Sequence, residues 1–252
     1  MINPMDLTDK HILISGASSG IGKETAIHLS QLGAKITMIA RNEQKLQKVK
    51  ANLEGDGHSY YSFDLNTLDE IEALVKKMVL EQGKFDGFVH SAGIGTARPL
   101  SLTTSKFVDE IMRINFYSFI ELTRIITKKK NCSDNASVVA VSSISSIMGD
   151  KAKTIYSASK GAIDSAVKSM AHELSERKIR INSVLPGYIN TEMTHEYYES
   201  VGEAAFEQDV LAKQYLGLGE PIDVANTIAF LLSDAAKLIT GTNLYVDGGY
   251  LS

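Results

Sequence analysis

Lys10-His-Ile-Leu-Ile-Ser-Gly16-Ala-Ser-Ser-Gly20-Ile-Gly22 is the stretch of sequence that decides the fold. Its first half is a short apolar strand, and its glycines open an amphipathic helix that continues through Leu32. A strand, a glycine turn and a helix together offer backbone N–H groups and a positive helix end to a pyrophosphate. The stretch therefore predicts a dinucleotide-binding unit at the start of the chain.

Each glycine of the turn has a physical reason to be there. Gly16 permits the tight turn, Gly20 lets a phosphate approach the backbone, and Gly22 lets the helix pack closely on the strand. The spacing is G-x-x-x-G-x-G, which differs from the general G-x-G-x-x-G fingerprint. The residues predicted to surround the pyrophosphate are Gly16, Ser18, Ser19, Gly20, Ile21 and Gly22.

Strand-like and helical patterns alternate along the rest of the chain. Helical periodicity marks residues 67–82 and 222–232, whereas short apolar runs predict strands at 12–15, 35–40, 59–63, 87–91, 137–142, 180–185 and 243–246. Repeated strand-helix-strand units imply right-handed crossovers and a parallel sheet covered on both faces. We therefore expect one α/β domain over residues 1–252, a Rossmann-type doubly wound parallel sheet of about seven strands with helices on both faces.

Length and composition agree with one globular domain. The chain has 252 residues, 44% of them hydrophobic and 22% charged, and a net charge of -4 gives no reason to expect nucleic acid or an anionic membrane as partner. Cys132 is the only cysteine, so neither an intrachain disulfide nor a metal site of clustered cysteines is expected. The sequence shows no secretion signal and no long apolar segment, which predicts a cytoplasmic protein.

Three polar residues in the middle of the chain suggest chemistry. Tyr156 and Lys160 stand four residues apart, and Ser143 lies thirteen residues before Tyr156, after an apolar strand-like run. Residues i and i+4 share a helix face, so the ammonium is expected to favour the tyrosinate and lower the tyrosine pKa from about 10. Such a tyrosine can act as a general acid or base. The alternatives are a solvated Tyr and Lys pair and, for Ser143, an ordinary serine-rich loop.

These motifs together resemble the short-chain dehydrogenase/reductase family. The likeness extends over residues 10–249 and includes, besides the glycine turn and the three polar residues, Asp64, Ala92-Gly93, Asn115, Pro186-Gly187 and Val246-Asp-Gly-Gly249. The resemblance implies that Tyr156 donates a proton to a carbonyl oxygen while Lys160 lowers its pKa and bonds the nicotinamide ribose. It further implies that Ser143 donates a hydrogen bond to the same oxygen.

Other site residues are also implied by the resemblance. Asn115 aligns with the fourth catalytic residue, which holds a water-linked proton path to the lysine; the alternative is a polar residue that ties its helix to the sheet. Pro186 and Gly187 let the backbone approach the nicotinamide, and Ile189 and Thr191 match positions that contact the carboxamide.

The end of the second predicted strand indicates the cofactor. Ala40 stands where a carboxylate would bind the ribose of NAD, and Arg41 offers a charged planar group for a 2′-phosphate. We therefore expect NADP(H), although Arg41 could be a solvated cation and Ser19 occupies a position that is basic in some NADP-using relatives. By resemblance, Asp64 and Leu65 contact the adenine; Asp64 could also cap the following helix.

The segment after the fourth predicted strand departs from the family pattern. Ser91 stands before Ala92-Gly93, where the family has asparagine, so the hydrogen bonding near the nicotinamide is expected to be weakened or rerouted. Ala92 and Gly93 still leave the small volume that the ribose needs. We expect His90 to be a packed strand histidine rather than a base.

Two helical segments and one irregular segment suggest surfaces for partners. Residues 105–128 and 154–175 are apolar around much of their circumference, which with the resemblance implies a homodimer or homotetramer; deep burial within one chain is the alternative. Residues 187–219 carry aromatic and apolar side chains after the end of a predicted strand, where open α/β sheets bind ligands. We interpret them as a substrate lid, against the alternative of an ordinary surface helix pair.

The leading functional hypothesis is an NADPH-dependent carbonyl reductase of a small-molecule carbonyl or alcohol substrate. Thioesters of 3-oxoacyl groups on acyl carrier protein are the first class to test, with a basic docking face formed by Lys128, Lys129, Lys130, Lys178 and Arg180. A solvated basic face is the alternative for these residues. An NADP-dependent alcohol, steroid or sugar dehydrogenase working oxidatively is the second hypothesis, and a non-catalytic NADP-binding sensor is the third.

Overall fold

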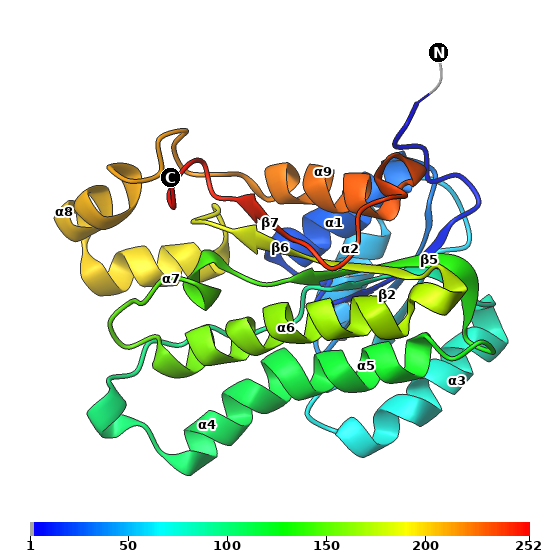
Figure 1. Cartoon of the computed structure of the whole chain (residues 1–252), viewed down its shortest axis with the longest axis horizontal. Helices are drawn as coiled ribbons and strands as arrows, with labels where there is room; N and C mark the ends of the chain where they lie inside the picture. Colours follow the sequence, from blue (N-terminus) through cyan, green and yellow to red (C-terminus); the bar gives the residue numbers. More distant parts are fainter. Residues whose placement is uncertain (1–2) are drawn as a thin grey trace.

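The computed structural model describes residues 3–252, so Met1 and Ile2 of the expected domain lie outside the described residues. Within this range the chain forms a seven-stranded parallel sheet of order β3-β2-β1-β4-β5-β6-β7 (Figure 1). The strands are β1 (His11–Ser15), β2 (Lys35–Ala40), β3 (Ser59–Ser62), β4 (Phe85–His90), β5 (Cys132–Val141), β6 (Arg180–Pro186) and β7 (Asn243–Val246). All seven predicted strands are present.

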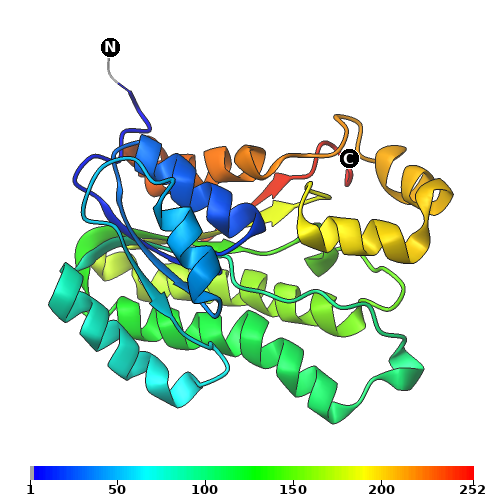
Figure 2. The ribbon, with the colours of Figure 1, turned by 180° about the vertical axis from the view of Figure 1, so that it is seen from behind.

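Helices cover both faces of the sheet, as the doubly wound prediction requires (Figures 1 and 2). One face carries α1 (Gly20–Gln31), α2 (Glu43–Lys50) and α9 (Pro221–Leu232). The other carries α3 (Ile71–Gln82), α4 (Ser105–Met112), α5 (Ser118–Ile126) and α6 (Thr154–Glu173). The predicted Rossmann-type fold class is therefore confirmed.

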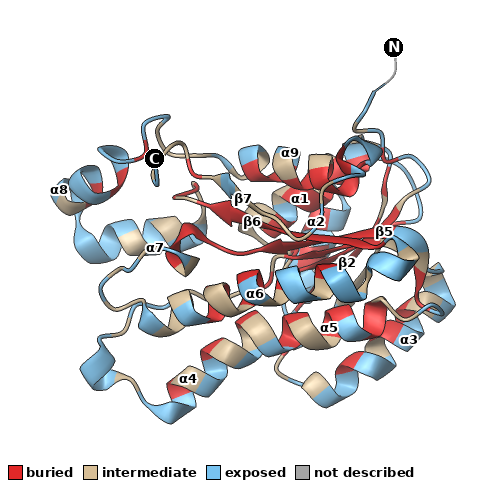
Figure 3. Ribbon diagram, in the orientation of Figure 1, coloured by how far each residue is buried: buried red, intermediate tan, exposed pale blue. Residues whose placement is uncertain are grey.

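The core follows from the apolar strands. Every residue of β1 and of β6 is buried, because helices shield both sides of these central strands (Figure 3). Two apolar layers result, one between the sheet and α1 and α9, and one between the sheet and α3, α5 and α6. The boundary of β5 differs from the prediction, since the strand begins at Cys132 rather than at residue 137 and its pairing with β4 shifts register between Phe85 and Gly87.

The strand order reverses beside β1, which pairs with β2 on one side and with β4 on the other. The helical connections on the two sides of β1 run in opposite directions. A crevice therefore opens beyond the carboxyl ends of the strands. Polar site residues that follow β1, β4, β5 and β6 all reach this end of the sheet. The topology thus brings together residues that are far apart in the sequence.

The predicted long helix over residues 105–128 is interrupted. A π-helical segment, Arg113–Tyr117, separates α4 from α5, and buried Asn115 lies at its centre. Ile111, Phe119 and Leu122 are buried within the chain, whereas Tyr117 is 41% exposed. Burial within one chain therefore explains part of the apolar surface, and the homodimer or homotetramer stays a prediction.

The segment 187–219 projects beyond the carboxyl ends of the strands (Figure 1). It contains α7 (Glu192–Val201), α8 (Glu203–Phe206) and a π-helical turn, Glu207–Leu211. Its two ends are tied together, because the Gln214 side chain accepts a hydrogen bond from Tyr188 N at 2.9 Å and donates one to Tyr188 O at 2.9 Å. The segment is thus a helical loop on a fixed base.

None of the helices within residues 3–252 combines the length and the apolar character that crossing a bilayer requires.

Candidate active site

Two cavities meet beyond the carboxyl ends of the strands. The larger, of about 650 Å³, extends from the glycine turn past the end of β2 to Tyr156, and the smaller, of about 310 Å³, lies between Tyr156 and α7. Ser143 and Tyr156 line both cavities. A molecule in the larger cavity and a molecule in the smaller one would therefore meet at these two side chains.

The larger cavity collects nearly all residues that the sequence predicted for a cofactor. Those that line it are Gly16, Ser18, Ser19, Gly20, Ile21, Arg41, Asp64, Leu65, Ala92, Gly93, Tyr156, Lys160, Pro186, Gly187, Ile189 and Thr191. Two predicted site residues are not in its wall. Gly22 lies beneath the turn, and Asn115 lies behind Gly93.

Backbone contacts shape the phosphate end of this cavity. Gly16 has φ +74°, and a Cβ on it would lie 2.5 Å from Ala92 N, so only glycine fits there. A Cβ on Gly22 would lie 2.4 Å from Gly16 O, which explains how α1 approaches the turn so closely. Ser19 caps α1 without a side-chain hydrogen bond, so the first N–H groups of the helix stay available to an anion.

The far end of the cavity is basic. Arg41 is exposed and lines the cavity together with Asn42 and Lys45, next to Ala40. Lys45 was not predicted from the sequence, although a basic residue in the first helical turn after the end of β2 is a signal that could have identified it. Asp64 also lines the cavity, and its Oδ1 accepts a hydrogen bond from Asn66 N at 3.0 Å, so it shapes a local turn as well.

The helix α6 carries Tyr156 and Lys160 on one face, and the turn after β5 brings Ser143 to them. Lys160 is buried, and its Nζ donates a hydrogen bond to Val141 O at 2.8 Å and lies 5.7 Å from the centre of the Tyr156 ring. Burial lowers the pKa of the Lys160 ammonium to about 8, and the carboxylate of Asp164, one turn further along α6, opposes this shift.

The expected lowering of the Tyr156 pKa is wrong for this structure. Burial raises the pKa of the Tyr156 phenol above its ordinary value, and a hydrogen bond with Ser143 acts in the opposite direction. Lys160 does not reverse the shift; its ammonium is bonded to Val141 O and lies 5.7 Å from the centre of the Tyr156 ring. Spacing along a helix places the two side chains together but does not fix their mutual orientation.

Asn115 is fully buried, and its side chain is bonded on both sides. Its Oδ1 accepts from Ile94 N at 2.9 Å, and its Nδ2 donates to Ile94 O and to Ser159 Oγ, both at 3.0 Å. These bonds join the π-helical segment to the loop after β4 and to α6. The structure therefore shows the tying contact that was the alternative for Asn115, and a role in proton transfer stays a prediction.

The histidine at the end of β4 is a packed residue. The His90 ring lies between Phe88 and Phe119, with Nδ1 2.9 Å from Ser15 Oγ. Burial, followed by the charge of Lys160, lowers the pKa of His90 to about 3, so the imidazole is neutral at physiological pH. The neighbouring Ser91 lines the cavity.

The residues present fit a dinucleotide. The cradle at Gly16 would be filled by a single Cβ, the N-terminal end of α1 offers unpaired N–H groups, and Arg41 and Lys45 supply positive charge where a ribose phosphate would lie. Gly93 leaves space beside Lys160, whose Nζ would be 3.3 Å from a Cβ there. The cavity is thus shaped by backbone at one end and charged at the other.

Comparison with known proteins agrees with this geometry. The family model described as enoyl-(acyl carrier protein) reductase matches residues 16–251. A 3-oxoacyl-[acyl-carrier-protein] reductase, FabG, of Thermotoga maritima is 33% identical over 247 residues, which cover 97% of this chain and 99% of that protein. The chain belongs to the short-chain dehydrogenase/reductase family.

Solved structures of the family superimpose closely on this chain. A short-chain dehydrogenase/reductase from Brucella melitensis, titled glucose/ribitol dehydrogenase, gives a TM-score of 0.90 at 26% identity and covers 97% of this chain and 98% of its own. A dehydrogenase/reductase from Sinorhizobium meliloti 1021 gives 0.87 at 27% identity, covering 99% and 98%. This short-chain dehydrogenase/reductase is therefore an oxidoreductase that acts on carbonyl or alcohol groups, in a family that uses a nicotinamide cofactor.

Proposed function

We propose that the protein is an NADPH-dependent reductase that converts a carbonyl group of a small molecule to an alcohol, with Tyr156 as proton donor. The observation that carries the proposal is the position of Ser143 and Tyr156 at the junction of the two cavities, with buried Lys160 beside them. The other residues that line both cavities are two glycines, Thr96, Met193, Thr194 and Glu196, and none of them is a phenol one helical turn from a buried lysine.

Each residue has its own role in the reduction. The residues that line the larger cavity would hold a reduced nicotinamide, which would supply the hydride for the carbonyl carbon. Ser143 donates a hydrogen bond to the carbonyl oxygen as negative charge develops there, and Tyr156 gives that oxygen its proton. Burial raises the pKa of Tyr156, so the phenol carries at neutral pH the proton that the reduction requires. The oxidative direction, our second hypothesis, needs the tyrosinate.

The charge at the far end of the larger cavity supports NADP(H) as the cofactor. Arg41 and Lys45 line it, and β2 ends in Ala40 where a carboxylate would repel a 2′-phosphate. The predicted contacts of Asp64 and Leu65 with the adenine and of Ile189 and Thr191 with the carboxamide are part of the same proposal.

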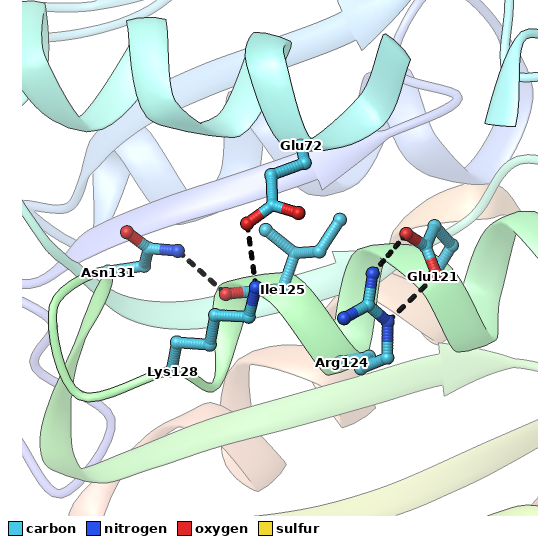
Figure 4. A network of polar contacts seen from close by, with 6 residues as sticks. All are labelled: Glu72, Glu121, Arg124, Ile125, Lys128 and Asn131. Carbon is cyan, nitrogen blue, oxygen red and sulfur yellow. Dashed lines mark hydrogen bonds and ion pairs between the residues drawn. The ribbon is translucent and has the colours of Figure 1, made fainter. Parts of the chain in front are cut away.

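The names of the relatives make 3-oxoacyl thioesters the first substrates to assay, bound to acyl carrier protein or free. The basic residues considered for docking a carrier do not support the bound form. Lys128 and its neighbours precede β5, whereas Ser143 follows this ten-residue strand, so about 30 Å separates them. Lys128 is also paired with Glu72 at 2.7 Å (Figure 4). Arg180 is buried and donates to Leu231 O and Ser233 O.

Absorbance of NADPH, followed with a panel of carbonyl compounds, tests the proposed function. We expect oxidation of NADPH by the wild-type protein, and loss of turnover by about 10³-fold in Tyr156→Phe with NADPH binding retained, because proton transfer by a positioned side chain contributes about 10²–10⁴-fold. Tight NADPH binding without turnover of any compound would instead favour the sensor hypothesis. Turnover by Tyr156→Phe at the wild-type rate would exclude Tyr156 as the proton donor.

A further inference from the structure

The smaller cavity has an unusual wall for a site that accepts an acyl chain. Ligand pockets are mostly lined by apolar side chains, with a few polar groups that orient the ligand. Here eight of the fifteen lining residues carry a hydroxyl group, while the carbon faces of three tyrosine rings, together with Ala97, Ile144 and Met193, supply the apolar part of the wall. At about 310 Å³ the cavity is also at the small end for ligand pockets. Both observations indicate a small polar substrate.

Two of these hydroxyls, those of Ser145 and Thr194, make no hydrogen bond within residues 3–252. Ser145 is only 4% exposed, and its Oγ makes no hydrogen bond to another described residue although it faces the cavity. The hydroxyl of Thr194, on α7 at the opposite side of the cavity, is likewise without a partner in residues 3–252. A hydroxyl both donates and accepts, so these two side chains fit substrate hydroxyls on either side of the carbonyl. An acyl chain would leave both unpaired, which is costly for the buried Ser145 hydroxyl.

Aromatic rings form another part of the wall. Tyr188 and Tyr197 pack with ring centres 5.6 Å apart, and Lys153 Nζ lies 5.2 Å and 4.6 Å from their centres. Lys153 is also ion-paired with Asp150 at 3.3 Å, so its charge is already balanced. Among the described residues that line it, the cavity therefore offers no free cation for an anionic substrate, and Glu196 adds a carboxylate that would repel one. Its rings are flat amphipathic surfaces suited to the C–H side of a hydroxylated carbon chain.

The negative charge of residues 187–219 disfavours the approach of an acidic carrier protein. Residues 187–219 expose six acidic side chains against one lysine, Lys213. An acidic carrier protein would meet like charge where its substrate must enter. A free uncharged molecule meets no such barrier.

From these observations we propose that the substrate is a small uncharged ketone or aldehyde with hydroxyl groups on carbons next to the carbonyl, such as a ketose or hydroxyketone, whose product is a polyol. The inference rests on the proposed carbonyl reductase function. It assigns Ser145 and Thr194 as residues that determine specificity by bonding substrate hydroxyls.

The test compares matched substrates with NADPH. The panel contains xylulose and dihydroxyacetone, their deoxygenated counterparts 2-pentanone and acetone, and an acetoacetyl thioester both on N-acetylcysteamine and on acyl carrier protein. We expect kcat/KM to be at least about 100-fold higher for each hydroxylated ketone than for its counterpart, because a site built to bond a hydroxyl rejects the analogue that lacks it. Thioester turnover equal to or faster than that of the best ketose overturns the inference.

Two variants and a control localise the effect. In Ser145→Ala and in Thr194→Val, the ratio of kcat/KM between hydroxylated and deoxygenated ketones should fall by about tenfold, the loss of one hydrogen bond. Ser146→Ala is the matched control, since Ser146 Oγ is also buried without a partner but Ser146 does not line the cavity. An unchanged ratio in both pocket variants overturns the assignment.

A second measurement separates the two proposals. Protection against thermal unfolding by each compound, in the presence of NADP⁺, reports binding without turnover. If no compound oxidises NADPH, the proposed function fails, and the preference of the cavity is still decided by whether xylulose protects better than 2-pentanone. If NADPH is oxidised but deoxygenated and hydroxylated ketones protect equally, only the substrate inference fails.

Discussion

The two halves of the site are built in different ways. The cofactor half consists of backbone at the carboxyl ends of β1 and β4 and of glycines that leave no space for a side chain, as at Gly16 and Gly22. The substrate half consists of side chains, most of them hydroxylated or aromatic, and many of these belong to the helical loop at 187–219. The shape of the cofactor half is fixed by close packing of the backbone, whereas a single substitution can change the lining of the substrate half.

The difference explains how one fold serves many substrates. A change of backbone shape at the glycine turn disturbs the sheet itself, because the turn packs between α1 and the end of β4. A change of side chain in the loop alters the smaller cavity without touching the core, since the loop is fixed to the sheet at its base by Gln214 and by the pairing of Ile189 with Gly219. We therefore expect large and general effects in the first half and selective effects in the second.

The largest expected effect is that of Gly22→Ala in the cofactor half. The added Cβ would lie 2.4 Å from Gly16 O, so helix α1 or the turn must move. Overpacking of this kind costs about 3 kcal/mol, and we expect the free energy of unfolding to fall by that amount and NADPH binding to be lost. Chemical denaturation and fluorescence titration measure the two effects.

Gly149→Ala is the control for this substitution. Gly149 has no positive φ, and a Cβ there would meet nothing within 4 Å, so stability should change by less than about 0.5 kcal/mol. Equal stability of the Gly22 and Gly149 variants would contradict the description of the cofactor half as closely packed backbone.

The sequence predicted most residues that line the larger cavity for the same reason. Glycine spacing, apolar strands and the end of β2 are local signals, and the parallel topology carries them to one edge of the sheet. It predicted the substrate half only as a segment, because Ser145 and Thr194 come together through tertiary packing that no local pattern records. The π-helical segment around Asn115 and the orientation of Lys160 were missed for the same reason: both depend on contacts with distant residues.

An intermediate effect is expected for Arg41→Ala, which tests whether the cofactor half also contains a selective part. Arg41 is exposed at the cavity wall, so its bond to a 2′-phosphate is partly screened, and we expect NADPH affinity to fall about 10- to 30-fold with NADH affinity unchanged. Lys48→Ala is the control, because Lys48 is exposed on α2, the helix that follows Arg41, and does not line the cavity. Loss of affinity for both cofactors alike would exclude recognition of the 2′-phosphate.

The smallest expected effect is on the pH dependence of kcat/KM, through the protonation of Lys160. This residue lies at the boundary of the two halves. Its pKa is lowered to about 8, so the ammonium is present below that pH and is lost as the pH rises through it. Because kcat/KM for NADPH reports the free enzyme, it should fall on the alkaline side near pH 8. The other titratable groups that face Lys160 do not mask this change, since the pKa of Tyr156 is raised and that of His90 is about 3.

Asp164→Asn tests the origin of that pKa. Asp164 is buried one turn from Lys160, with Oδ1 accepting from Ser183 Oγ at 2.9 Å and Oδ2 without a partner among the described residues. Removing its charge leaves the ammonium less favoured, so the alkaline limb should move to lower pH by about half a unit, which is about twofold in rate at pH 8 and about threefold well above that pH. Ser183→Ala keeps the carboxylate and should leave the limb in place. A shift in the Ser183 variant but not in the Asp164 variant would show that hydrogen bonding rather than charge sets the protonation of Lys160.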